Sequence, residues 1–326
     1  MTLLRRPFVD LDGAVVVLTG ASSGIGRATA QRLASRGARL VLAARGEPAL
    51  EDTAQECRDL GAEVLAVATD VSVHEQVSEL RRRAVDRFGR IDAWISNAGV
   101  MAYGQFAEVP LEAHRKVIET NLLGPMYGAV EAIQCFHEQE GKGVIVNVAS
   151  LYAEMTSPIV SSYVTSKFGL LGFSRALRRD TYGHDDIAVC CVLPGSIDTP
   201  IFRHAANYYG KQTRGIPPVS SPERVARAIA GCMERPRKEV RIGFVSRFFA
   251  LGETVAPPIY DRLVGPAFRL LGFRDEDVPA HDGNVFEPSP DWKRVDGGWR
   301  NTTARRAAAV GAVAAAGVVV AARRAA

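Results

Sequence analysis

The chain has 326 residues, enough for one large α/β domain or two small ones. Hydrophobic residues make up 47% and charged residues 23%, as in a globular protein with a substantial core. The net charge is only +4, and the arginines are scattered along the sequence, which argues against a nucleic-acid-binding protein. The run RRRAVDR at 81–87 is better interpreted as the solvated face of a helix.

The cysteines indicate a reducing environment. They stand at positions 57, 135, 190, 191 and 232, with no C-x-x-C spacing and no histidine at ligand spacing. We therefore expect buried, reduced thiols and no metal site. Together with a first segment that lacks the apolar core of a signal peptide, this favours a cytoplasmic location.

Short aliphatic runs recur along the chain up to about residue 245. In order they are AVVVLTG, RLVLAAR, EVLAVATD, DAWISNAG, GVIVNVAS, IAVCCVLPG and EVRIGF. They are apolar throughout rather than alternating, which is typical of strands covered on both faces. Helical periodicity separates them, for example over 26–37, 74–89 and 161–183. This alternation predicts a doubly wound α/β fold over 1–245: a parallel sheet of about seven strands with helices on both faces.

The pattern changes in the extension 246–304. An apolar stretch there predicts one or two short helices, and the following stretch, rich in Pro, Gly and Asp, predicts extended or disordered chain. In the tail 305–326, residues 307–322 are apolar and lie between arginine pairs. As a helix they would span about 24 Å, less than the roughly 30 Å of a bilayer core. A membrane anchor, a helix docked on a partner and a floppy tail are all compatible with this segment.

A glycine-rich turn follows the first strand. The stretch TGASSGIG places Thr19, Gly20, Gly24 and Gly26 between a buried strand and a helix. Glycine permits a tight turn and close approach of a pyrophosphate, which the helix N-terminus then stabilises. The spacing is G-x3-G-x-G, so a plain tight turn is the alternative to a dinucleotide site.

The residues after the second and third strands indicate which dinucleotide is bound. The second strand ends in Ala44 and Arg45, without a carboxylate for the adenosine ribose. An arginine can bind a 2′-phosphate, so we expect NADP(H) in preference to NAD(H), unless Arg45 simply points to water. Asp70 follows the third strand and is expected to meet the adenine amine, and the backbone of SNAG at 96–99 is expected to border the cofactor.

Tyr163 and Lys167 stand four residues apart in SSYVTSKFGLLGF, at the start of an apolar helical pattern. Residues at this spacing lie on one helix face, so the phenol and the amine are expected to be neighbours. An ammonium beside a phenol stabilises the phenolate and lowers its pKa toward the working pH. Ser150 ends the fifth long strand, and its hydroxyl can face the same crevice.

Taken together, these motifs resemble the classical short-chain dehydrogenase/reductase family. The resemblance rests on TGASSGIG, Asp70, NAG at 97–99, Asn121 in NLLG, Ser150, YVTSK at 163–167 and PGSIDT at 194–199. It covers roughly residues 10–245 and not the extension beyond. Ser96 stands where the family often has an asparagine, which is a small departure.

The resemblance implies an oxidoreductase with a catalytic tetrad. Tyr163 is the implied general acid or base, and Lys167 lowers its pKa and holds the nicotinamide ribose. Ser150 binds the substrate oxygen, and Asn121 positions a water in a proton relay. The implied cofactor-binding residues are Thr19, Gly20, Ser22, Ser23, Gly24, Ile25, Gly26, Arg45, Asp70, Val71, Asn97, Ala98, Gly99, Tyr163, Lys167, Pro194, Gly195 and Thr199.

The expected substrate is a hydrophobic carbonyl compound or alcohol. The loops after the catalytic strands carry apolar and aromatic residues that either line its site or pack within the loops: Met101, Tyr103, Leu151, Met155, Phe202, Tyr208 and Tyr209. By resemblance we also expect a homodimer or homotetramer paired through 112–140 and 161–182. The alternatives are a catalytically silent nucleotide-binding regulator or scaffold, and an enzyme whose tail mainly directs it to a membrane or partner.

Overall fold

A computed structural model describes residues 7–139, 141–243, 253, 255–289, 291 and 293–300. The predicted tail at 305–326 lies outside these residues. Within them, no helix has both the length and the apolar character needed to cross a membrane.

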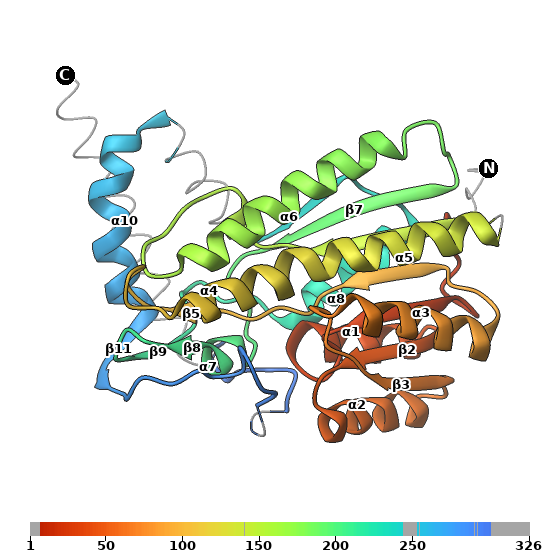
Figure 1. Cartoon of the computed structure of the whole chain (residues 1–326), viewed down its shortest axis with the longest axis horizontal. Helices are drawn as coiled ribbons and strands as arrows, with labels where there is room; N and C mark the ends of the chain where they lie inside the picture. Colours follow the sequence, from red (N-terminus) through yellow and green to blue (C-terminus); the bar gives the residue numbers. More distant parts are fainter. Residues whose placement is uncertain are drawn as a thin grey trace.

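The core of the molecule is a seven-stranded parallel sheet in the order β10-β7-β6-β4-β1-β2-β3 (Figure 1). The strands are β1 (Val15–Thr19), β2 (Arg39–Ala44), β3 (Val64–Ala68), β4 (Ala93–Ser96), β6 (Gly143–Val148), β7 (Ile187–Pro194) and β10 (Glu239–Ile242). Each corresponds to one of the seven aliphatic runs, which confirms the predicted doubly wound fold. The order reverses between β1 and β4, so a crevice forms at the carboxyl ends of these strands.

Helices cover both faces of the sheet. On one face lie α1 (Gly24–Ala34), α2 (Glu47–Asp59) and α8 (Pro222–Glu234); on the other lie α3 (His74–Phe88), α5 (Gly124–Glu138) and α6 (Ser161–Asp180). Successive strand residues point to opposite faces, so Val16 and Leu18 pack in one core and Val15 and Val17 in the other. Two covered faces explain why the strands are apolar throughout.

The helical segment predicted over 112–140 is interrupted by a π-helical turn. It consists of α4 (Leu111–Ile118), the turn Glu119–Leu123 and α5. Such turns often occur at functional sites, and this one carries Asn121. Smaller elements complete the crevice side of the molecule: β5 (Ala102–Tyr103), a 3-10 turn (Leu151–Ala153), α7 (Ile201–His204), β8 (Ala206–Asn207) and β9 (Lys211–Thr213).

The described part of the extension packs on the catalytic core. Helix α10 (Pro257–Gly272) forms from the apolar stretch, and β11 (Phe273–Asp277) pairs antiparallel with β9. The following segment, described at 284–289, 291 and 293–300, is called the strap below. The described residues of the strap are mostly irregular and make hydrogen bonds with the core.

Candidate active site

The glycine turn is built by close backbone contacts. Gly20 has φ of +66°, and a Cβ on Gly26 would lie 2.0 Å from the Gly20 carbonyl oxygen, so neither position accommodates a side chain. The Asn97 side chain donates to the carbonyls of Gly20 at 3.0 Å and Thr19 at 3.1 Å. The Thr19 hydroxyl in turn accepts from the amides of Asn97 and Ala98. The turn after β1 is thereby fixed to the end of β4.

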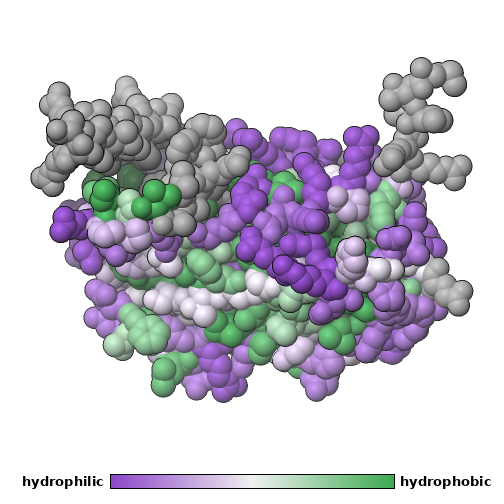
Figure 2. Space-filling view, turned by 90° about the horizontal axis from the view of Figure 1, so that it is seen from above, coloured by the Kyte–Doolittle hydropathy of each residue, from purple (hydrophilic) through white to green (hydrophobic). Residues whose placement is uncertain are grey.

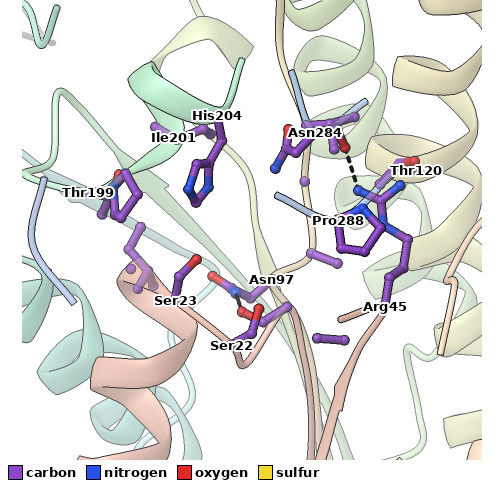
Figure 3. Close-up of a pocket in the computed structure, with 18 of the residues that line it drawn as sticks. Ser22, Ser23, Arg45, Asn97, Thr120, Thr199, Ile201, His204, Asn284 and Pro288 are labelled. Carbon is purple, nitrogen blue, oxygen red and sulfur yellow. Dashed lines mark hydrogen bonds between the residues drawn. The ribbon is translucent and has the colours of Figure 1, made fainter. Parts of the chain in front are cut away.

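A cavity of about 200 Å³ lies above this turn (Figure 3). Most of the predicted cofactor-binding residues line it: Gly20, Ser22, Ser23, Gly24, Ile25, Arg45, Asp70, Val71, Asn97, Ala98, Gly99, Tyr163, Lys167, Pro194 and Thr199. Thr19 and Gly26 support the turn instead, and Gly195 faces a second cavity. The N-terminus of α1 and a turn with glycine at positions 20, 24 and 26 suit a pyrophosphate, so these residues fit a dinucleotide.

Asp70 lies at the edge of this cavity. Its carboxylate accepts from the amine of Lys116 at 2.9 Å and from the hydroxyl of Ser72 at 2.7 Å. Burial acts to raise the pKa of Asp70, but these bonds outweigh it and the pKa is lowered. Asp70 is therefore an ionised acceptor at neutral pH, as hydrogen bonding to an adenine amine requires.

Arg45 has a different environment from the one that its sequence position predicts. Its guanidinium donates to strap carbonyls: Phe286 at 2.9 Å, Val285 at 3.1 Å, and Asn284 (Figure 3). Burial lowers its pKa, but an arginine side chain is not deprotonated in proteins and remains a cation. Arg45 lines the cavity, but it is hydrogen-bonded to the strap, a contact that its position after β2 does not predict.

The four predicted catalytic residues lie near the C-terminal end of β6 and the N-terminal end of α6. The Lys167 amine donates to the Val148 carbonyl at 3.1 Å and lies 5.6 Å from the ring centroid of Tyr163. Ser150 Oγ accepts from the Tyr152 amide at 3.2 Å, and the Ser150 side chain acts to lower the pKa of Tyr163. Predicted neighbours on one helix face are thus neighbours in the structure.

Asn121 is buried, and both the oxygen and the nitrogen of its side-chain amide form hydrogen bonds. Its Oδ1 accepts from the Val100 amide at 2.8 Å, and its Nδ2 donates to the Val100 carbonyl at 2.9 Å and to Ser166 Oγ at 3.1 Å. Ser166 then donates to the carbonyl of Tyr163 at 2.7 Å. Asn121 therefore links the loop after β4 to the first turn of α6. Ser166 has no sequence signal beyond its place inside YVTSK.

Burial dominates the titration of both key groups. It raises the pKa of Tyr163 to about 12, against a smaller lowering by the Ser150 hydrogen bond. It lowers the pKa of Lys167 to about 8. The lowered tyrosine pKa expected from the sequence is therefore wrong for the chain by itself, because removal from water costs the phenolate more than the interaction with Ser150 returns.

A second cavity of about 200 Å³ adjoins the first and is mainly apolar. Met101, Tyr103, Leu151, Met155 and Phe202 line it, as the sequence predicts. Tyr208 and Tyr209 do not: the Tyr208 hydroxyl donates to Asp282 at 2.6 Å, and Tyr209 packs on Phe273 with ring centroids 4.7 Å apart.

Helix α10 contributes a wall of the second cavity that the sequence analysis did not assign to the site. Val264, Ala267, Phe268 and Leu271 line the cavity from this helix. Their spacing of three, one and three residues places them on one helix face. That periodicity was the available signal, but the position of the helix relative to the sheet is a tertiary property.

The two cavities share five lining residues: Ile25, Tyr163, Pro194, Thr199 and Ile201. Of these, Tyr163 carries the phenolic hydroxyl, and it is buried. A phenol thus stands between a cleft that fits a dinucleotide and an apolar cavity.

Comparisons with known proteins agree with this arrangement. The family model described as short chain dehydrogenase matches residues 14–209. An uncharacterized oxidoreductase, YxnA from Bacillus subtilis, is 35% identical over 258 residues, covering 78% of this chain and 72% of YxnA.

Two solved structures share the fold. A short chain dehydrogenase/reductase from Burkholderia phymatum in complex with NAD has a TM-score of 0.65 and 28% identity over 72% of this chain and 90% of its own. An alcohol dehydrogenase from the archaeon Thermococcus sibiricus, complexed with 5-hydroxy-NADP, has a TM-score of 0.61 and 28% identity over 71% of this chain and 96% of its own.

Proposed function

This chain belongs to the short-chain dehydrogenase family and is an NAD(P)-dependent oxidoreductase, and we propose that it interconverts a carbonyl and an alcohol on an apolar small molecule. The observation that carries the proposal is the position of Tyr163, which lines both the dinucleotide cleft and the apolar cavity. A proton donor at that junction can serve a substrate oxygen while the carbon beside it faces the nicotinamide. The bound nicotinamide supplies the hydride chemistry.

Each residue of the tetrad has a role suited to its contacts. Tyr163 protonates the developing alkoxide in reduction and accepts the proton in oxidation. Ser150 lines the apolar cavity together with Tyr163, so its hydroxyl can stabilise charge on the substrate oxygen. Lys167, cationic below a pKa of about 8, stabilises phenolate character on Tyr163 and can hold ribose hydroxyls. Asn121 positions the loop after β4 and the start of α6, between which a relay water would sit.

NADP(H) is the favoured dinucleotide of this proposal. Strand β2 ends at Ala44, so no carboxylate there repels a 2′-phosphate. Arg45 lines the same end of the cleft. A guanidinium has five N–H donors, and the three bonds from Arg45 to the strap leave donors for a phosphate.

The apolar cavity supports a hydrophobic ketone, aldehyde or secondary alcohol as substrate. Its lining is aliphatic and aromatic on the sides formed by β5, by the 3-10 turn and by α10. Such a surface selects by shape and apolar contact rather than by hydrogen bonding. A silent nucleotide-binding scaffold needs neither this cavity nor a proton donor beside it.

The assembly and location of the enzyme are part of the same proposal. Met126 and Val130 on α5 and Phe168 on α6 are exposed, and apolar residues also surface among polar ones on the face seen in Figure 2. Burial of these exposed apolar side chains in an interface would be favourable, which supports a homodimer or homotetramer paired through α5 and α6.

The buried cysteines without disulfide bonds favour a cytoplasmic enzyme. Its catalytic domain would be 1–245, with 246–304 as an accessory segment.

The proposal is tested by comparing two tyrosines that share one cavity. Tyr163→Phe removes the proton donor, so NADPH-dependent reduction of hydrophobic ketones should fall by about 10²–10⁴-fold. Tyr152→Phe is the matched control. The ring centroid of Tyr152 lies 6.1 Å from that of Tyr163, and Tyr152 lines the apolar cavity but not the dinucleotide cleft. NADPH binding, followed by fluorescence, should persist in both variants. Full activity in Tyr163→Phe would overturn the assignment.

A further inference from the structure

We propose that the strap is a working part of the dinucleotide site: it closes over the bound nucleotide and must open for the nucleotide to enter or leave. The inference rests on the proposed function, because it places the dinucleotide in the first cavity. The strap lies outside the segment matched by the family model, which ends at residue 209.

One edge of the strap is bound to the glycine turn and to the end of β2. The Gly24 amide donates to the Arg294 carbonyl at 2.9 Å, and Arg27 Nη1 donates to the carbonyl of Lys293. Arg45 donates to carbonyls at the other end of the strap. These contacts join residues far apart in the sequence across the mouth of the cleft.

The opposite edge is bound to the segment around α7. The amide of Asn284 donates to the His204 carbonyl at 2.7 Å, and His204 Nε2 lies 3.0 Å from the carbonyl oxygen of Asp291. Figure 3 shows His204 on one side of the cavity and Arg45 with Pro288 on the other, with Asn284 between them and hydrogen-bonded to Arg45. The strap therefore bridges both walls of the cleft.

The far end of the strap is anchored by Asp198 and Trp299. The Asp198 carboxylate accepts from the amides of Gly297 at 3.1 Å and Trp299 at 2.8 Å. The buried Trp299 indole donates to the Thr199 carbonyl at 3.0 Å and meets the Phe202 ring edge-on, with centroids 6.0 Å apart. Asp198 and Thr199 belong to PGSIDT, so this anchor joins the strap to the predicted nicotinamide end of the cleft.

The strap forms a roof over the cleft rather than filling it. The cavity beneath it is lined at once by the glycine turn and by the strap residues Asn284, Pro288, Ser289, Asp291 and Lys293. A segment that blocked the site would leave no cavity between these two surfaces. Bound nucleotide would thus be enclosed from both sides, and its release would require the strap contacts to break.

A disulfide that locks the strap tests this directly. A Cβ on Gly46 would lie 3.2 Å from the Pro288 Cβ, close to the spacing of disulfide-bonded cysteines. Gly46→Cys with Pro288→Cys therefore links the end of β2 to the strap, and the five native cysteines are buried and unpaired. The variant is loaded with NADPH, oxidised, and mixed with excess NADP while the loss of NADPH fluorescence is followed.

Release from the oxidised form should be slower than from the reduced form by about tenfold or more, equivalent to about 1.4 kcal/mol. Equal release rates would overturn the strap as a closing element. Failure of the disulfide to form while NADPH is bound, or loss of all NADPH binding after oxidation, would show that the strap competes with nucleotide, and would also overturn the proposal. Failure of the unmodified chain to bind NADPH or NADH would overturn the proposed function itself.

Weakening the contacts of Trp299, which anchor the strap, should accelerate NADPH release. Trp299→Ala removes the indole and should accelerate NADPH release, whereas Trp299→Phe keeps the ring contact with Phe202 and should do so less. Glu234→Gln is the matched control, because it alters a hydrogen bond to Arg36 that does not involve the strap. Faster association and tighter binding in Trp299→Ala, with unchanged release, would contradict a closing role.

Discussion

The amine of Lys167 lies 5.6 Å from the ring centroid of Tyr163, and both side chains are buried. Burial moves the two pKa values apart and reverses their order: that of the phenol rises to about 12, and that of the amine falls to about 8. The group that titrates nearest neutral pH is therefore the lysine, and the tyrosine keeps its proton well above that pH. This order determines how activity should depend on pH.

We expect kcat/KM for carbonyl reduction to fall as pH rises through about 8. Below that pH Lys167 is cationic and assists proton release from Tyr163; above it the charge is lost while the phenol is still protonated. Because kcat/KM reports groups of the free enzyme, the falling limb should have the pKa of Lys167. Steady-state rates over a pH series measure it.

Lys167→Arg provides the control for that profile, because a guanidinium stays protonated throughout the range. Whatever its overall rate, this variant should lack the falling limb near pH 8. The same limb in Lys167→Arg would assign the titration to another group, and the electrostatic role of Lys167 would then be wrong.

The sheet and the proximity of Tyr163 to Lys167 could be predicted because local patterns determine them. Wholly apolar runs such as those of β1 and β6 report burial on two faces, and a spacing of four residues puts Tyr163 and Lys167 on one face of α6. The pKa of Tyr163 could not be predicted in the same way. It depends on how completely tertiary packing removes the phenol from water, and the spacing alone does not contain this information.

The environment of Arg45 is a second property that local sequence patterns do not predict, because it depends on residues far away in the sequence. Its position after β2 predicts a nucleotide contact, but its bonded carbonyls belong to residues 284–286. Backbone carbonyls carry no side-chain signal, so a strap that binds through them has little sequence pattern. The composition of this segment indicates irregular chain correctly and gives no indication of what it covers.

Arg45→Ala should reduce the preference for NADPH over NADH by about 10–100-fold, the effect of removing one or two charge-assisted hydrogen bonds. The preference is the ratio of the two kcat/KM values. Loss of the bonds to the strap affects both dinucleotides alike, so the ratio isolates recognition of the 2′-phosphate. A ratio that does not change, or a wild-type enzyme that prefers NADH, would show that Arg45 serves the strap alone.

Ala267→Phe should narrow the apolar cavity from the side of α10. Ala267 lines this cavity, so the added ring would occupy substrate space. We expect kcat/KM for bulky hydrophobic ketones to fall by about tenfold or more relative to small ones. Leu263→Phe is the control, because Leu263 is exposed on the same helix and should leave the substrate range unchanged. Equal losses for large and small ketones in Ala267→Phe would place the substrate elsewhere.

Gly143→Ala should destabilise the fold, because the sheet and α5 meet closely at that position. An added Cβ would lie 2.3 Å from the buried Phe136 ring, and overpacking of this kind costs about 1–3 kcal/mol. Gly172→Ala is the matched control: Gly172 lies inside α6 with no atom within 4 Å of an added Cβ, so the change should stabilise the helix by about 0.5–1 kcal/mol. Urea unfolding midpoints should therefore shift in opposite directions, and a Gly143→Ala midpoint at or above that of the unmodified chain would contradict the close packing of β6 against α5.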